Sequence, residues 1–115
     1  MRRQFEGTPA DLRAARRFVA EHLPAHLVAD AELLVSELAS NAVMHVGSRF
    51  EVDIVPAEDC VRVEVIDPDP TPPTPRRAVT GDVSGRGLHI VDRVSSAWGC
   101  RVDTNGKCVW FELRR

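Results

Sequence analysis

The chain has 115 residues, enough for one domain with a single hydrophobic core. Its net charge is −2 and 28% of its residues are charged, so it lacks a basic footprint and we expect no nucleic-acid partner. No apolar run approaches the roughly 20 residues that span a bilayer, and no hydrophobic core follows the basic N-terminus. We therefore expect neither a membrane segment nor a signal peptide.

The first predicted helix begins at Thr8-Pro9-Ala10-Asp11. Thr8 is a good cap, Pro9 suits the first helical position, and Asp11 completes a capping box. Apolar residues follow at helical spacing until Pro24 ends the helix. A second, more apolar helix is predicted from near Ala29 or Asp30 to a stop at Gly47, and its composition predicts cover on more than one side.

Two β-hairpins are predicted after these helices. Apolar residues alternate at 50–55 and 61–66 around a turn at 56–59, and again at 98–102 and 109–113 around Thr104-Asn105-Gly106-Lys107. A short third helix containing Leu88 and Val91 precedes the second hairpin. The three cysteines, Cys60, Cys100 and Cys108, fall in these strands and match no metal-ligand spacing. We expect buried, reduced thiols in a cytoplasmic protein.

Between the hairpins, a proline-rich segment at about 68–85 has no apolar periodicity, and long loops of this kind are often functional lids. Helices mixed with hairpins predict an α+β fold. Specifically, we expect one domain over residues 1–115, a two-layer α/β sandwich whose mostly antiparallel sheet is covered by helices on one face.

Chemically capable residues cluster on the second helix. Glu37, Asn41 and His45 are spaced four apart, and at ~100° per residue they share one helix face with Leu34. Polar groups beside an apolar stripe indicate a pocket wall. The alternative is a local hydrogen-bonded pair at the edge of the core, and for His45 a packing role at the helix end is the preferred interpretation.

Two further features follow along the chain. Asp67 ends a predicted strand just before the lid, and Gly85-Arg86-Gly87 precedes the third helix. Glycines before a helix let backbone N–H groups face an anion, which the helix dipole favours. An ordinary N-terminal turn explains the glycines equally well. Taken together with Glu37 and Asn41, these features indicate a nucleotide site.

The motifs resemble the nucleotide boxes of the GHKL ATPases, which include gyrase, Hsp90 chaperones and sensor histidine kinases. They are Glu37-x-x-x-Asn41-Ala42-x-x-His45, Val65-Ile66-Asp67 and Gly85-Arg86-Gly87-Leu88. The phrase around Glu37, with Trp98-Gly99 and Gly106-Lys107-x-x-Trp110, is similar to the anti-sigma-factor serine/threonine kinases, particularly the small stand-alone versions of actinomycetes. The resemblance spans about Pro9 to Leu113 and implies a Bergerat-type ATP-binding fold.

The resemblance also implies roles, with ATP and Mg²⁺ as cofactors. Asn41 would hold Mg²⁺, Glu37 would be the general base that activates a protein serine, and Asp67 would accept from the adenine amine. The third box, Gly85-Arg86-Gly87-Leu88, would form the hinge beside the phosphates. The implied partners are a sigma factor and an anti-anti-sigma protein, and because family members often dimerise, a homodimer is also implied.

One departure from the family pattern affects these expectations. The family's Asp-x-Gly-x-Gly is replaced here by Asp67-Pro68-Asp69-Pro70, and proline removes an N–H donor and fixes φ. This favours the alternative function, a catalytically weak or inactive module that regulates a partner by binding alone. Arg76 and Arg77 in the lid are interpreted as solvated charges rather than phosphate ligands. The absence of a phospho-acceptor helical domain argues against a sensor kinase.

Overall fold

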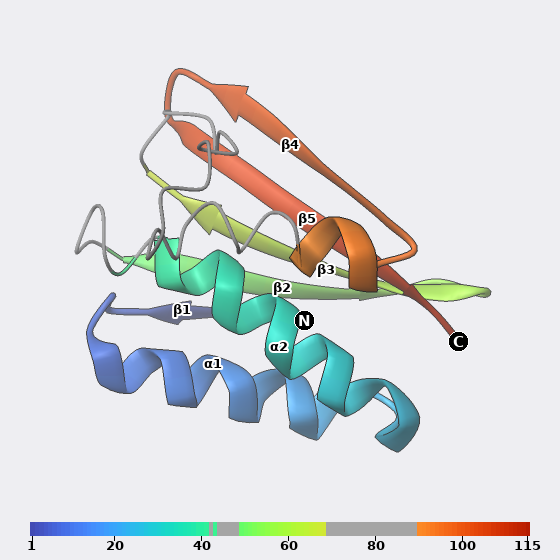
Figure 1. The fold of residues 1–115 in the computed structure, drawn as a ribbon. Coiled ribbons are helices and arrows are strands. Elements are labelled where there is room, and N and C mark those ends of the chain that lie inside the picture. The colour runs from blue at the N-terminus through green and yellow to red at the C-terminus, as the bar shows by residue number, and fades with distance from the viewer. Residues whose placement is uncertain (42, 44–48, 69–89) are drawn as a thin grey trace, which may run out of the picture.

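The computed structural model describes residues 1–41, 43, 49–68 and 90–115. In these residues, two helices cover one face of a five-stranded sheet (Figure 1). The elements are β1 (Arg2–Phe5), α1 (Pro9–His22), α2 (Ala25–Asn41), β2 (Phe50–Pro56), β3 (Cys60–Asp67), a helical segment at 90–94, β4 (Ala97–Asp103) and β5 (Gly106–Arg114). The predicted α+β sandwich with helices on one face is confirmed.

The start of α1 follows from the predicted capping box. The backbone N–H and the hydroxyl of Thr8 both donate to Asp11 Oδ2, at 3.0 and 2.8 Å, and these bonds lower the pKa of the Asp11 carboxyl. Pro9 is the first helical residue, as predicted.

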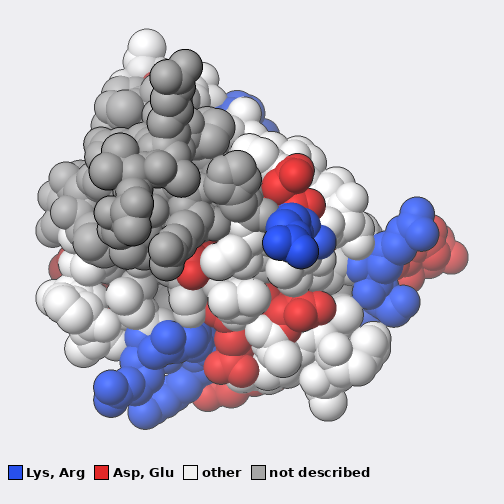
Figure 2. Space-filling view, in the orientation of Figure 1, with Lys and Arg blue, Asp and Glu red and all other residues white. Residues whose placement is uncertain are grey.

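Figure 2 shows basic side chains gathered over α1 with acidic side chains beside them, so this part of the surface carries both signs of charge.

The prediction for the beginning of α2 was wrong. The helix starts at Ala25, not near Ala29 or Asp30, and the Leu27 N–H donates to the Pro24 carbonyl at 2.9 Å. Pro24 ends α1 and also precedes the first turn of α2, where its missing N–H costs nothing. As predicted, α2 has neighbours on more than one side, since it packs on α1, β3 and β5. The predicted stop at Gly47 lies outside the described residues.

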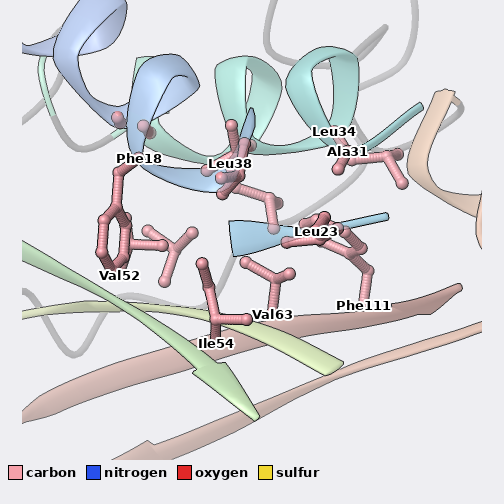
Figure 3. Packing of buried hydrophobic residues seen from close by; sticks show 14 of the residues in the cluster. Phe18, Leu23, Ala31, Leu34, Leu38, Val52, Ile54, Val63 and Phe111 are labelled. Atoms are coloured by element: carbon pink, nitrogen blue, oxygen red, sulfur yellow. The ribbon is translucent and has the colours of Figure 1, made fainter. Parts of the chain in front are cut away.

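The core lies between the helices and the covered face of the sheet (Figure 3). Alternate residues of β2, β3 and β5 face it, as the period-two pattern predicted. The largest fully buried side chains are Phe18, Phe50, Phe111, Leu34 and Ile54. Removing this apolar surface from water is the main favourable term in folding.

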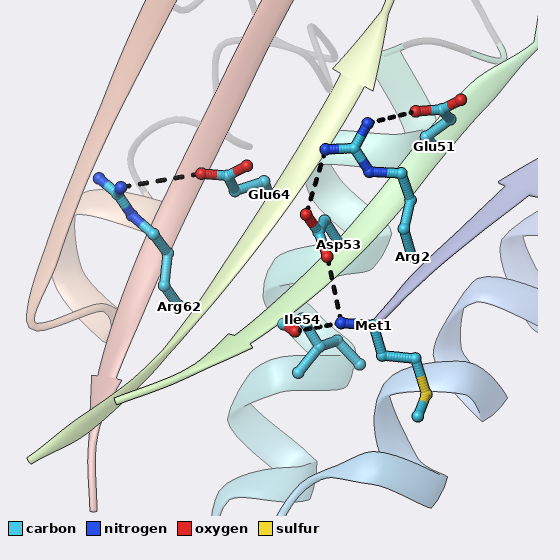
Figure 4. Close-up of polar contacts among 7 residues, drawn as sticks. All are labelled: Met1, Arg2, Glu51, Asp53, Ile54, Arg62 and Glu64. Carbon is cyan, nitrogen blue, oxygen red and sulfur yellow. Dashed lines mark hydrogen bonds and ion pairs between the residues drawn. The ribbon is translucent and has the colours of Figure 1, made fainter. Parts of the chain in front are cut away.

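The sheet order is β1-β2-β3-β5-β4, with every neighbouring pair antiparallel. Both predicted hairpins are present. Strand β1 was not predicted, because three of its four residues are exposed and it therefore lacks an apolar alternation. Its partner β2 also binds the chain end, since the Met1 amino group donates to the Ile54 carbonyl at 2.8 Å (Figure 4).

The prediction of three buried thiols holds only in part. All three cysteines are free, but Cys108 alone is buried, Cys60 is half-buried and Cys100 is exposed. Burial raises the pKa of the Cys108 thiol to about 11. Cys100 and Val102 alternate with their neighbours as predicted, yet both are exposed, because the buried pattern fades along β4.

Among the described residues, no helix is long and apolar enough to cross a membrane.

Candidate functional site

Two of the predicted site segments come to the same end of the sandwich. Figure 1 shows the C-terminal end of α2 and the end of β3 on one side of the molecule, where β5 begins. Glu37 lies one turn before the last residue of α2, and Asp67 is the last residue of β3. The fold therefore brings the first and second motifs to one edge, although 30 positions separate these two residues in the sequence.

Other predicted site residues lie outside the described part of the chain. Asn41 is the last residue of α2, but the structure describes only its backbone and not its side chain. The same holds for His45 and for the complete third box, Gly85, Arg86, Gly87 and Leu88, as well as for Arg76, Arg77 and most of the lid at 68–85. Their assigned roles stay predictions.

Glu37 lies at the margin of the core. Its neighbours Leu34 and Leu38 are buried, whereas Glu37 itself is half-buried. This burial raises the pKa of the Glu37 carboxyl above its ordinary value. A carboxylate with a raised pKa is a better proton acceptor near neutral pH, which is the property that a general base needs.

Asp67 is a buried charged residue at the end of a core strand. Val61, Val63 and Val65 alternate along β3 with their side chains in the core, and Asp67 continues this series on the covered face. Its carboxylate forms an ion pair with the Lys107 ammonium, Oδ2 to Nζ, at 3.2 Å. The side chains are only 4% and 9% exposed. Buried charges are rare unless paired, so this pair is the unusual electrostatic feature of the edge.

Lys107 was not among the predicted site residues. It was seen only as part of a C-terminal motif, because the sequence does not reveal the register between β3 and β5. That register places Lys107 directly opposite Asp67. The available signal was the pattern itself, since Lys107 occupies a position of the same parity as the core residues Val109, Phe111 and Leu113.

Gly106 allows β5 to start close beside the end of β3. Its φ is +149°, and a Cβ at this position would lie 2.1 Å from the Asp67 carbonyl oxygen and 2.9 Å from Pro68 Cα. Those atoms are backbone and cannot move aside cheaply. The glycine of this motif therefore lets Lys107 reach the position opposite Asp67.

The Trp-Gly and Gly-Lys-x-x-Trp motifs also have a structural role on the uncovered face of the sheet. A Cβ on Gly99 would lie 2.5 Å from Trp110 Cζ2, so the absence of a side chain makes room for the indole. On that face the Arg62 guanidinium lies 3.9 Å from the Trp110 ring centroid. The Gly99–Trp110 contact joins β4 to β5 and the Arg62–Trp110 contact joins β3 to β5, and both lie on the opposite face from Asp67.

Two hollows of about 270 and 250 Å³ lie near the same edge. Several of their lining residues occupy the uncovered face of the sheet, namely Gln4, Glu51, Glu64, Ile66, Arg101 and Cys108. Asp67 also borders both hollows, but strand alternation directs its side chain to the covered face. The hollows therefore do not correspond to the pocket expected beside the Asp67 carboxylate. Within the described residues, no group of three metal-ligating side chains comes together.

The comparison with protein families agrees with the geometry. A family model described as "Histidine kinase-like ATPase domain" matches residues 5–113, nearly the whole chain. The chain therefore belongs to this family. The match confirms the GHKL-type resemblance and supports ATP binding within a kinase-like ATPase fold. No curated protein matches the chain.

Proposed function

We propose that this histidine kinase-like ATPase domain is a cytoplasmic anti-sigma regulatory factor that binds ATP with Mg²⁺ and phosphorylates a serine of an anti-anti-sigma protein. Family membership supports the ATP-binding part. The motif phrase around Glu37 favours the anti-sigma kinases within that family. The observation that carries the kinase part is the half-buried Glu37 carboxyl near the C-terminal end of α2. That end of α2 lies on the same side of the sandwich as the end of β3, whose last residue is Asp67 (Figure 1).

Each residue has a defined task in this proposal. Glu37 takes the proton from the serine hydroxyl while that oxygen forms its bond to the γ-phosphorus, and ADP leaves. Asn41 would hold the Mg²⁺, which when bound would supply neutralising charge to the phosphates. Asp67 accepts a hydrogen bond from the adenine amine. Gly85, Arg86, Gly87 and Leu88 form the phosphate-side hinge of the lid.

Desolvation of Glu37 fits the role of general base, because a carboxylate of ordinary pKa holds a proton too weakly for efficient transfer at neutral pH. Asp67 fits a base-recognition role because its burial favours any partner that can donate a hydrogen bond to it. Both residues are held by regular elements, α2 and β3, and rigid elements position functional groups better than loops do.

A second function is favoured by the chain next to Asp67. Pro68 has no backbone N–H to donate, and the Lys107 ammonium already lies 3.2 Å from the Asp67 carboxylate. If these features weaken nucleotide binding, the domain regulates a sigma factor or another partner by binding alone. The kinase and the binding module differ in whether phosphate is transferred.

The deciding experiment is a transfer assay with γ-labelled ATP, Mg²⁺ and a panel of anti-anti-sigma proteins from the same genome. We expect wild type to label one of them and Glu37→Gln to lose the transfer while still binding ATP. Glu32→Gln is the matched control, because Glu32 is also half-buried on α2. Equal transfer by Glu37→Gln would refute its role. ATP binding without transfer to any panel member would favour the binding module.

A further inference from the structure

Lys107 contributes a buried ammonium to the edge where Asp67 is expected to meet the purine. We infer that Lys107 is a specificity-determining residue which, together with Asp67, recognises the Watson–Crick edge of adenine. In this arrangement Asp67 accepts from the exocyclic amine and Lys107 donates to the ring nitrogen N1. The inference rests on the proposed function, and it adds a residue to which neither the motifs nor the family match assigns a role.

The positions of the two side chains carry the first step. Asp67 and Lys107 are cross-strand partners in the β3–β5 register, and both continue the core-facing series of their strands. Any group that meets the Asp67 carboxylate on the covered face therefore also meets the Lys107 ammonium 3.2 Å away. A purine base that binds the Asp67 carboxylate at this edge therefore contacts Lys107 as well.

The chemistry of the pair carries the second step. An ammonium offers three N–H donors, and a carboxylate accepts at two oxygens, so such a pair can keep its own contact while each member bonds to a third group. Side by side, the two groups present an acceptor next to a donor. Adenine presents the complement, an amine donor at C6 next to the N1 acceptor. A 6-oxopurine in the same pose presents an acceptor to Asp67 and an N–H to Lys107, and both contacts are repulsive.

The energetics of burial carry the third step. Taking both charges out of water is costly, and replacing a buried ion pair by packed apolar residues is often neutral or stabilising. The neighbouring positions on the same face are apolar, namely Val65 and Val109. An apolar pair at positions 67 and 107 would thus continue the core, so a charged pair there is better explained by recognition than by stability.

The first test uses unaltered protein and three nucleotides, each titrated by calorimetry with Mg²⁺ present. ATP has the amine and N1, 1-deaza-ATP lacks only the N1 acceptor, and ITP reverses both groups. Because a hydrogen bond to a charged group contributes substantially, we expect 1-deaza-ATP and ITP to bind roughly 10- to 100-fold more weakly than ATP. Equal affinity for ATP and 1-deaza-ATP would overturn the inference and leave ATP binding itself intact.

The second test assigns the N1 contact to Lys107. In Lys107→Met, checked for folding by circular dichroism, we expect ATP to bind more weakly and the difference between ATP and 1-deaza-ATP to disappear. Arg101→Met is the control, because Arg101 lies on β4 near the same edge but on the uncovered face, and it should keep the full difference.

The outcomes separate the inference from the proposed function. If Lys107→Met keeps the full preference for ATP over 1-deaza-ATP, or binds ATP more tightly than wild type does, Lys107 is not the N1 donor and only the further inference fails. If wild type binds none of the three nucleotides, the proposed function fails with it.

Discussion

The two faces of the sheet both carry ion pairs, and these pairs differ sharply in their surroundings. On the uncovered face, Arg2 bonds Glu51 and Asp53 at 3.3 and 3.2 Å, with its side chain 55% exposed (Figure 4). On the covered face, Asp67 and Lys107 are less than one-tenth exposed. Exposed pairs contribute little to stability, while a buried charge depends on its partner. The N–O distances of the two sets of ion pairs are alike, so the difference in their expected contribution to stability comes from burial.

The comparison teaches where charge is incidental and where it is specific. On the uncovered face, Arg62 lies 3.7 Å from both Glu64 and Glu112, and its side chain is 32% exposed, so these ion pairs are long and partly hydrated. Asp67 and Lys107 form a contact between fixed strand positions at the edge where the nucleotide is expected. A change on the covered face should therefore affect both folding and binding, whereas one on the uncovered face should affect neither strongly.

The largest effect should come from Phe111, which is fully buried on the covered face of β5. Phe111→Ala should lower the free energy of unfolding by about 3–5 kcal/mol, because it leaves a cavity. Its neighbour Trp110 is half-buried on the uncovered face, so Trp110→Ala should cost clearly less. Urea denaturation measures both, and similar losses would contradict the assignment of the two faces.

The next effect concerns the buried ion pair. Lys107→Met should destabilise the protein by about 3 kcal/mol or more, because it removes the cation from beside a buried carboxylate. The double variant Asp67→Leu with Lys107→Met should recover much of this loss, since it removes both charges. A double variant no more stable than Lys107→Met would show that the pair is not the source of the loss.

On the uncovered face, Arg2→Ala should change the unfolding free energy by less than about 1 kcal/mol. The difference between wild type and Arg2→Ala should shrink as salt is added, since screening weakens exposed pairs. Urea titrations at low and high ionic strength provide the check. A loss as large as that of Lys107→Met would remove the distinction between the faces.

The smallest effect is a pH dependence at Glu37. Burial raises its pKa above the ordinary value of 4.5, so the folded state holds this proton more tightly than the unfolded state does. The carboxyl's contribution to stability is therefore fully present below pH 4.5 and is lost as the pH rises through the folded-state pKa. Glu37→Gln should equal wild type below pH 4.5 and be slightly more stable at pH 7. A variant less stable than wild type at pH 7 would refute this account.

Much of the architecture was predictable because strong local signals agree with the tertiary structure. The capping box at Thr8 starts α1, and period-two alternation produces both hairpins around their turns. What was missed lacked such a signal. Strand β1 has a single buried residue, Phe5, and depends on β2 as its partner. The helix α2 starts earlier than predicted because Pro24 both ends α1 and directly precedes the first turn of α2. The prediction treated this proline only as the end of a helix.

The residues of the candidate site could likewise be predicted only where a local sequence signal marks them. Asp67 could be selected from its place at the end of a strand, whereas Lys107 could not be selected, because its proximity to Asp67 depends on strand register over a separation of 40 residues. Exposure of Cys100 was likewise not predictable, since alternation gives the face of a strand but not how far the helices cover it.

The most direct test of the account is a calorimetric titration of the purified protein with ATP, with and without Mg²⁺. We predict Mg²⁺-dependent binding to the wild type that is weakened in Asp67→Asn. The absence of any binding at millimolar ATP would contradict the nucleotide site and make regulation by binding alone the leading function.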